Sequence, residues 1–128
     1  MRIGKLATSC DCPVETIRYY EKIGLLPQPT RLANGYRSYD DVHGKWLQFI
    51  LRSRALGFSQ DEVRRLTDLA HQKRPACVEV HDLLQEHVDD VQDRIRELKR
   101  MKRALVRLKD KCHDGTLHDC PVIDELMS

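Results

Sequence analysis

"CPVETIRYYEKIGLL", residues 12–26, predicts the second helix of a helix-turn-helix and decides the fold of the front half of the chain. Pro13 suits a first helical turn, and Val14, Ile17 and Tyr20 recur at the spacing of one helical face. Gly24 then ends the helix, because a glycine is favoured just beyond the last turn.

A shorter helix is predicted immediately before it, in "RIGKLATSC" at residues 2–10. Ile3, Leu6 and Ala7 have the i, i+3, i+4 spacing of one helical face. Two short helices joined by a tight turn form a helix-turn-helix, whose second helix enters the major groove of DNA. An ordinary helical hairpin with a solvated face fits the same spacing. The residues expected to face outward on the second helix are Glu15, Thr16, Arg18 and Tyr19.

A small hairpin is predicted next, around Asn34 and Gly35. This dipeptide suits a two-residue turn, because both positions tolerate positive φ. Arginines and tyrosines flank it, and their side chains can bind phosphate oxygens. An exposed hairpin without a function would more often carry mixed lysine and glutamate, so we interpret this one as a DNA-binding wing. The flanking residues are Arg31, Tyr36, Arg37 and Tyr39.

Two connecting helices are predicted after the wing. Gly57 separates them, and Ser59 with Glu62 forms a capping box for the second. Trp46 and Phe49 are interpreted as core residues rather than base-stacking groups. The apolar stripe of the first of these helices is predicted to consist of Val42, Trp46, Leu47, Phe49, Ile50 and Leu56.

The composition fits a soluble globular protein with a basic front half. The 128 residues suffice for one small domain with an appendage, and 33% charged residues suggests long solvated helices. Residues 1–75 carry 13 Lys/Arg against 8 Asp/Glu, whereas residues 76–128 carry 9 against 12. No apolar run approaches the roughly 20 residues of a membrane span, and no apolar signal segment begins the chain. We therefore expect a cytoplasmic protein whose basic front half faces nucleic acid.

A long helix is predicted in the back half, because residues 77–112 contain neither glycine nor proline. Its apolar residues alternate between steps of three and four, with one irregularity near Met101, which is the pattern of a coiled-coil seam. A seam this narrow needs a partner helix, and a second copy of the chain is the economical source. The seam residues are Val80, Leu84, Val88, Val91, Ile95, Leu98, Met101, Leu105 and Leu108.

The five cysteines are expected to be reduced thiols available to metals. Cys77 and Cys112 lie at opposite ends of the long helix, roughly 50 Å apart at 1.5 Å per residue, so one chain cannot bring them to one ion. In a parallel dimer each would meet its own symmetry mate. In an antiparallel dimer, Cys77 of one subunit would lie beside Cys112 and Cys120 of the other. Cys10 and Cys12 are interpreted as small, half-buried residues at a tight turn.

The segment "IGKLA…CPVETIRYYEKIGLLPQPTRLANGYRSY" resembles the N-terminal domain of MerR-family transcription regulators, and the resemblance extends over nearly the whole chain. It implies a winged helix-turn-helix and a symmetric antiparallel dimer on a pseudo-palindromic promoter. It also implies that the effector-bound form distorts the promoter so that RNA polymerase can use it. The DNA contacts that it implies are Thr16, Arg18, Tyr19 and Tyr20 of the recognition helix, Arg31, Tyr36 and Arg37 of the wing, and Arg54 beyond the wing.

The resemblance also bears on the metal. The loop "CHDGTLHDCPVI" is similar to that of copper sensors, and two thiolates alone suit Cu(I). Copper-type members, however, carry a serine at the position of Cys77, whereas sensors of divalent ions carry cysteine. The segment "CVEVHDLLQEH" further resembles the cadmium/lead branch, although His81 departs from it. His113 and His118 could complete a tetrahedral site, which would favour zinc or cadmium, but we interpret them as solvated and leave them out of the ligand set.

We therefore expect a mainly α protein that is not an enzyme, since no nucleophile–base constellation or phosphate loop is present. The predicted parts are a winged helix-turn-helix domain at 1–74, a dimerisation helix at 75–111 forming an antiparallel coiled coil, and a C-terminal metal-binding loop with a short helix at 112–128. The expected function is a homodimeric activator of metal-resistance genes that binds Cd, Pb or Zn through Cys77, Cys112 and Cys120. The alternatives are a Cu(I)-responsive regulator and a redox-sensing regulator.

Overall fold

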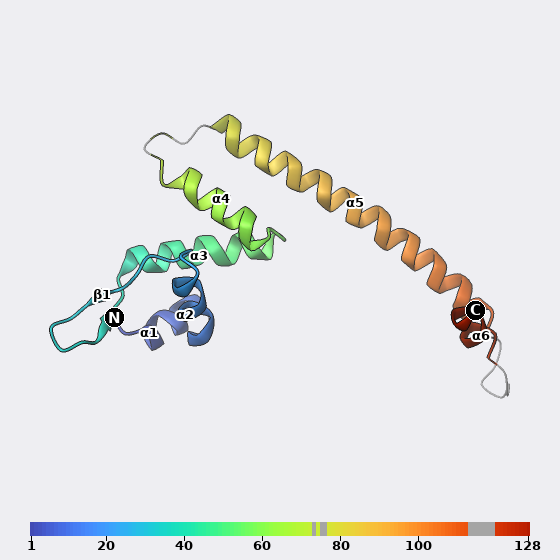
Figure 1. The fold of residues 1–128 in the computed structure, drawn as a ribbon, viewed down its shortest axis with the longest axis horizontal. Helices are drawn as coiled ribbons and strands as arrows, with labels where there is room; N and C mark the ends of the chain where they lie inside the picture. Colours follow the sequence, from blue (N-terminus) through green and yellow to red (C-terminus); the bar gives the residue numbers. More distant parts are fainter. Residues whose placement is uncertain (73, 75–76, 113–119) are drawn as a thin grey trace. The chain divides into compact units, whose positions relative to one another are not determined.

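The computed structural model describes residues 1–72, 74, 77–112 and 120–128, and their fold is mainly α, as predicted (Figure 1). The chain divides into two compact units, residues 1–80 and residues 81–128. The domain boundaries at 74/75 and 111/112 remain predictions. The elements in chain order are α1 (Ile3–Cys10), α2 (Val14–Lys22), β1 (Thr30–Arg31), β2 (Arg37–Ser38), α3 (Asp41–Ala55), α4 (Gln60–Ala70), α5 (Cys77–Asp110) and α6 (Pro121–Met127).

The helix-turn-helix is formed by α1 and α2. Asp11 makes the turn between them with a left-handed backbone, φ 51°, which aspartate tolerates better than most residues. The amide of Cys12 donates to the carbonyl of Ala7 at 3.0 Å and so closes the end of α1. Leu6 of α1 and Ile17 of α2 are completely buried, so the two helices share one core.

The wing is the antiparallel pair of β1 and β2, in which Thr30 lies opposite Ser38 and Arg31 opposite Arg37. Its turn differs from the predicted two-residue turn. The amide of Leu32 donates to the carbonyl of Tyr36 at 2.8 Å, and the amide of Gly35 donates back to Leu32 at 2.9 Å. Three residues therefore connect the last bonded pair, and only Gly35 among them has positive φ, at 85°. The Asn34 side chain instead accepts the Tyr36 amide at 3.1 Å, which fixes the turn.

The predicted apolar stripe of α3 is partly wrong. Leu47 and Ile50 are completely buried, but Val42 is 53% exposed and Leu56 is 68% exposed. Val42 lies in the first turn of α3 and Leu56 just beyond its last residue, where the neighbouring helices cover less of the helix surface. The predicted capping box of α4 is confirmed, since Glu62 N–H donates to Ser59 Oγ and Ser59 N–H donates to Glu62 Oε1.

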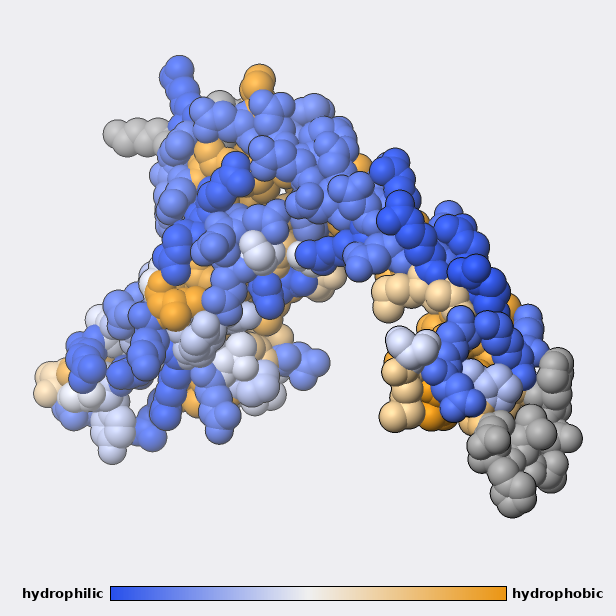
Figure 2. Space-filling view, turned by 45° about the vertical axis from the view of Figure 1, so that its right-hand side comes forward, coloured by the Kyte–Doolittle hydropathy of each residue, from blue (hydrophilic) through white to orange (hydrophobic). Residues whose placement is uncertain are grey.

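The seam of α5 is exposed in the single chain. This helix runs unbroken for 34 residues, and its apolar side chains reach the surface between charged ones. Figure 2 shows such apolar residues, in orange, beside the blue of the hydrophilic side chains. Within the described part of the chain, no helix is both long and apolar enough to cross a membrane.

The short helix α6 lies against the C-terminal end of α5. Lys111 Nζ and Glu125 Oε2 form an ion pair at 2.6 Å. A cleft of about 250 Å³ between the two helices is lined by Leu108 and Leu126 among other residues. The last described residues of the chain thus contact the end of α5.

Candidate DNA-binding face and metal-ligand positions

The predicted contacts on the recognition helix α2 divide into exposed and buried residues. Arg18 and Tyr19 are exposed, and Thr16 is half-buried. Tyr20 is only 7% exposed, because it lies on the same inward face as Ile17. The outward face predicted from the spacing is therefore present, and the DNA contact of Tyr20, which came from the resemblance alone, stays a prediction.

The C-terminal end of α2 is attached to α4. The hydroxyl of Tyr19 donates to Gln60 Oε1 at 3.1 Å. Arg64 Nη2 donates to the carbonyl of Ile23 at 2.6 Å, and its guanidinium lies over Gly24, whose φ is 80°. A helix end with unsatisfied carbonyls favours such a cation. The recognition helix is therefore held in place by the helix that precedes the dimerisation helix in the sequence.

The wing is held to α2 by a buried carboxylate that the spacing of the sequence did not single out. Glu21 accepts a hydrogen bond from the Tyr39 hydroxyl at Oε1, and Arg37 Nη1 donates to its Oε2 at 3.3 Å. Burial, reinforced by the hydrogen bond to Glu21, raises the pKa of Tyr39 to about 12. The position of Glu21, four residues after Ile17 on the inward face of the helix, was the available signal that this carboxylate needs a partner.

The remaining predicted DNA contacts, in the wing and beyond it, are exposed. Arg31, Tyr36 and Arg37 are all exposed. Arg54, also exposed, donates from Nη1 to the carbonyl of Phe58 at 2.8 Å, so part of its guanidinium closes the loop after α3. These DNA-binding assignments remain predictions.

The two cysteines of the helix-turn-helix differ in burial. Cys12 is buried and Cys10 is half-buried. Burial raises the pKa of the Cys12 thiol, and the neighbouring Cys10 and Asp11 add to this effect. Because metals bind thiolates, a thiol with a raised pKa is a weak ligand. The arrangement agrees with a structural role for this pair.

The three predicted metal ligands lie at the ends of helices. Cys77 is the exposed first residue of α5, Cys112 is exposed two residues after its last residue, and Cys120 is half-buried immediately before α6. Among the described residues of one chain, no group of three potential ligands includes a cysteine. His113 and His118 lie outside the described residues. His81 is exposed and its Nδ1 lies 3.5 Å from Asp82.

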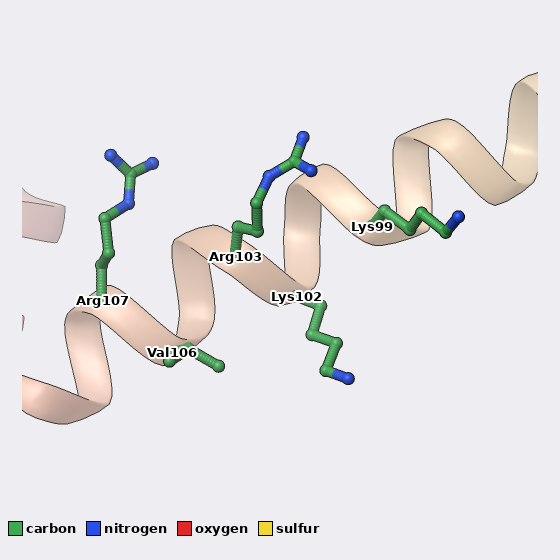
Figure 3. A pocket seen from close by; sticks show the side chains of 5 residues that line it. All are labelled: Lys99, Lys102, Arg103, Val106 and Arg107. Carbon is green, nitrogen blue, oxygen red and sulfur yellow. The ribbon is translucent and has the colours of Figure 1, made fainter.

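The charge of α5 changes sign near its middle. Residues 77–93 contain six carboxylates and no lysine or arginine, whereas residues 94–110 contain eight lysines and arginines and two carboxylates. Figure 3 shows part of the basic half, where Arg103 and Arg107 project from one side of the helix and Lys102 and Val106 from another. With Lys99 these residues line a hollow along the helix.

Comparison with known proteins gives matches over the whole chain. A family model described as "MerR HTH family regulatory protein" matches residues 1–69, and one described as "MerR, DNA binding" matches residues 45–108. Together they cover both the helix-turn-helix and most of α5.

Three similar proteins illustrate the likeness. The mercuric resistance operon regulatory protein of Bacillus cereus is 39% identical over 98% of this chain and 96% of its own. The transcriptional regulator HmrR of Rhizobium leguminosarum bv. viciae is 43% identical over 98% and 97%. The crystal structure of the transcription regulator PbrR691 from Ralstonia metallidurans CH34 in complex with lead(II) has a TM-score of 0.87, at 39% identity and 98% coverage of both chains.

Proposed function

The chain belongs to the MerR family of transcription regulators, and from this membership we propose that it binds promoter DNA as a homodimer and responds to a thiophilic divalent metal ion. Proteins of this family regulate transcription and are not enzymes. The finer proposal is that Cd(II), Pb(II) or Zn(II) is the effector and that metal-resistance genes are activated when the bound dimer distorts the promoter for RNA polymerase.

DNA binding is supported by two elements that project basic and hydroxyl-bearing side chains. The recognition helix exposes Arg18 and Tyr19, and the wing exposes Arg31, Tyr36 and Arg37. Arginine donates paired hydrogen bonds to phosphate or guanine, and tyrosine donates one to phosphate. Because Glu21 joins the wing to the recognition helix, the two elements would meet the duplex as one body.

An antiparallel homodimer is supported by the exposed seam and by the charge of α5. A parallel pair would align six carboxylates with six carboxylates and eight cations with eight cations. An antiparallel pair aligns the acidic half of each helix with the basic half of the other, and opposite charges at such a surface favour association in one orientation. The charge pattern of α5 therefore supports the antiparallel orientation, in addition to the family resemblance.

The metal site rests on one observation, which is that Cys77 and Cys112 are at opposite ends of an unbroken 34-residue helix. In an antiparallel dimer, Cys77 of one subunit would complete a site with Cys112 and Cys120 of the other. Cys77 and Cys112 are exposed and Cys120 is half-buried, and three thiolates suit a soft divalent ion better than they suit Cu(I). The relatives whose names or titles mention mercury and lead support this class of ion.

A complementation experiment tests the shared site. Neither Cys77→Ser nor the double variant Cys112→Ser/Cys120→Ser forms a complete site as a homodimer. When the two proteins are mixed and allowed to exchange subunits, each heterodimer regains one complete site. We expect thiolate-to-metal absorption with Cd(II) or Pb(II) to be lost in each variant alone and to reappear on mixing. If mixing restores nothing although heterodimers form, the ligands do not come from two subunits.

Two matched measurements complete this test. Cys10→Ser changes a thiol that lies on the helix-turn-helix, so its Cd(II) absorption and affinity are expected to match those of the wild type. Cu(I), the alternative effector, needs only Cys112 and Cys120. If Cys77→Ser keeps transcriptional activation by Cu(I) while the wild type ignores Cd(II) and Pb(II), the copper alternative replaces the divalent one.

A further inference from the structure

A cleft of about 220 Å³ lies between the first residues of the chain, the recognition helix and the wing. Three of its lining residues are arginines, and none of the described residues that line it is acidic. Two of these arginines were already predicted to contact DNA, whereas the third, Arg2, was not singled out by the sequence. The lining includes Arg2, Arg18, Gly35, Tyr36, Arg37 and Tyr39.

The position of Arg2 is fixed by its neighbours. Its guanidinium carbon lies 4.5 Å from the centre of the Tyr36 ring, within the range of a cation–π contact. The backbone beside it is bound on both sides, since the Met1 nitrogen donates to the Tyr39 carbonyl at 2.6 Å and the Tyr39 amide donates to the Met1 carbonyl at 2.7 Å. The carbonyl of Arg2 accepts the amides of Lys5 and Leu6 in the first turn of α1. Arg2 is therefore held beside the wing tip rather than on a loose end.

The cleft keeps an excess of positive charge. Glu21 lies 3.3 Å from Arg37 and neutralises one guanidinium of the three. Arg2 and Arg18 remain as a surplus of two positive charges in the cleft, which Tyr36, 53% exposed, also lines. Arginine guanidiniums bind tetrahedral oxyanions through paired hydrogen bonds.

We infer that Arg2 binds a backbone phosphate of promoter DNA in this cleft, together with Arg18 and Arg37. The inference rests on the proposed DNA-binding function and adds one residue to it. When α2 lies in the major groove and the wing contacts the flanking DNA, one sugar–phosphate strand runs between α2 and the wing. The cleft opens at that place. Phosphate contacts set the position of a protein on DNA without reading sequence. Arg2 therefore contributes to affinity and not to the choice of bases.

The test compares Arg2→Ala with the wild-type dimer on two duplexes. One is a duplex enriched by the wild type from a random-sequence library, and the other is an unrelated duplex of equal length. Affinities are measured between 50 and 200 mM salt. We expect Arg2→Ala to lose about threefold to tenfold on both duplexes, and its slope of log K against log salt to shrink by about 0.9 for each phosphate that it no longer binds. Arg2→Lys keeps the charge, so its slope is expected to return to the wild-type value.

The control is Lys45→Ala, which removes the same charge from an exposed position on α3 outside the cleft. We expect its salt slope and affinity to stay near those of the wild type. If Arg2→Ala leaves the slope unchanged, or if Lys45→Ala changes it equally, the phosphate site is wrong. A wild-type dimer that enriches no duplex at all would overturn the proposed function itself, which is a different outcome. Thermal unfolding of each variant checks that it is folded, so that the measured affinities are those of folded proteins.

Discussion

The two units of the chain differ in how they bury apolar side chains: residues 1–80 bury them within one chain, and residues 81–128 leave most of them exposed. In the first unit Leu6, Ile17 and Leu47 are completely buried within one chain. In the second, Leu98 is 60% exposed and Leu105 is 62% exposed along the face of a helix. The first unit therefore carries its own core, whereas the second presents half of a core that a second copy is proposed to complete. In the proposed function, DNA recognition is therefore built within a chain, and metal sensing is built between chains.

The largest expected effect comes from the seam of α5. The proposed dimer buries Leu98 of both subunits. Leu98→Ala should therefore weaken the free energy of dimerisation by about 2 kcal/mol or more for each subunit. About 4 kcal/mol in total corresponds to an increase of roughly 10³-fold in the dimer dissociation constant. Sedimentation equilibrium of the metal-free protein measures this constant directly.

Leu32→Ala is the matched control for this experiment, because Leu32 is also a half-exposed leucine but lies in the wing. Its dimer dissociation constant is expected to equal that of the wild type. A Leu98→Ala protein that remains as tightly dimeric as the wild type would show that the exposed face of α5 is not the interface, and the contrast between the two units would fail.

A smaller effect is expected within the first unit, at the hydroxyl of Tyr39. Folding raises the pKa of Tyr39 from 10.0 to about 12, so the neutral hydroxyl is the form that the folded state favours. The stabilisation is complete below pH 10 and is lost as the pH rises through 12. At pH 11 the free energy of unfolding is lower by about 1 kcal/mol from this group alone.

Urea unfolding of the wild type and of Tyr39→Phe at pH 9 and at pH 11 measures this loss. Tyr39→Phe has no hydroxyl to ionise, so the stability difference between the two proteins should narrow by about 1 kcal/mol at the higher pH. Tyr36→Phe, which removes an exposed hydroxyl, should follow the wild type at both values. Parallel curves for the wild type and Tyr39→Phe would mean that the contact with Glu21 does not favour the neutral hydroxyl.

The smallest expected effect concerns the orientation of the second unit. In the antiparallel dimer the acidic and basic halves of α5 attract, so raising sodium chloride from 0.05 to 1 M should weaken the dimer, by roughly threefold to tenfold. In a parallel dimer, like charges would be aligned and salt would strengthen it. The sign of the salt dependence, read from sedimentation equilibrium without DNA, therefore distinguishes the two orientations.

The sequence predicted the local elements well and the polar contacts between them poorly. The spacing of Ile17 and Tyr20 located α2, and Ser59 with Glu62 located the start of α4, because such signals lie within one or two turns of a helix. The pairing of Glu21 with Arg37 and Tyr39 joins residues 16 and 18 positions apart. No local pattern specifies such a contact.

The exposure of Val42 and Leu56 was missed for a related reason. Periodicity identifies the apolar face of a helix but not how far its neighbours extend along that face. The metal site presents a harder case, since its proposed ligands come from two chains. From the sequence, the metal site could be predicted only from the length of the helix and from the resemblance to the MerR family.

In the proposed metal site, the contact between Lys111 and Glu125 would make the tail a preformed chelating arm. It joins two residues 14 positions apart, on either side of the segment that contains Cys112 and Cys120. Closing a ring of this size costs on the order of 2 kcal/mol of chain entropy, and here that cost is met on folding rather than on metal binding. In the proposed site an ion would therefore dissociate from this arm only when two bonds break nearly together. Cys77 of the other subunit, held by no such ring, would be the ligand that exchanges singly. A metal ion would then bind first to Cys112 and Cys120 and afterwards to Cys77 of the other subunit. When metal is removed, the bond to Cys77 would be the first to break.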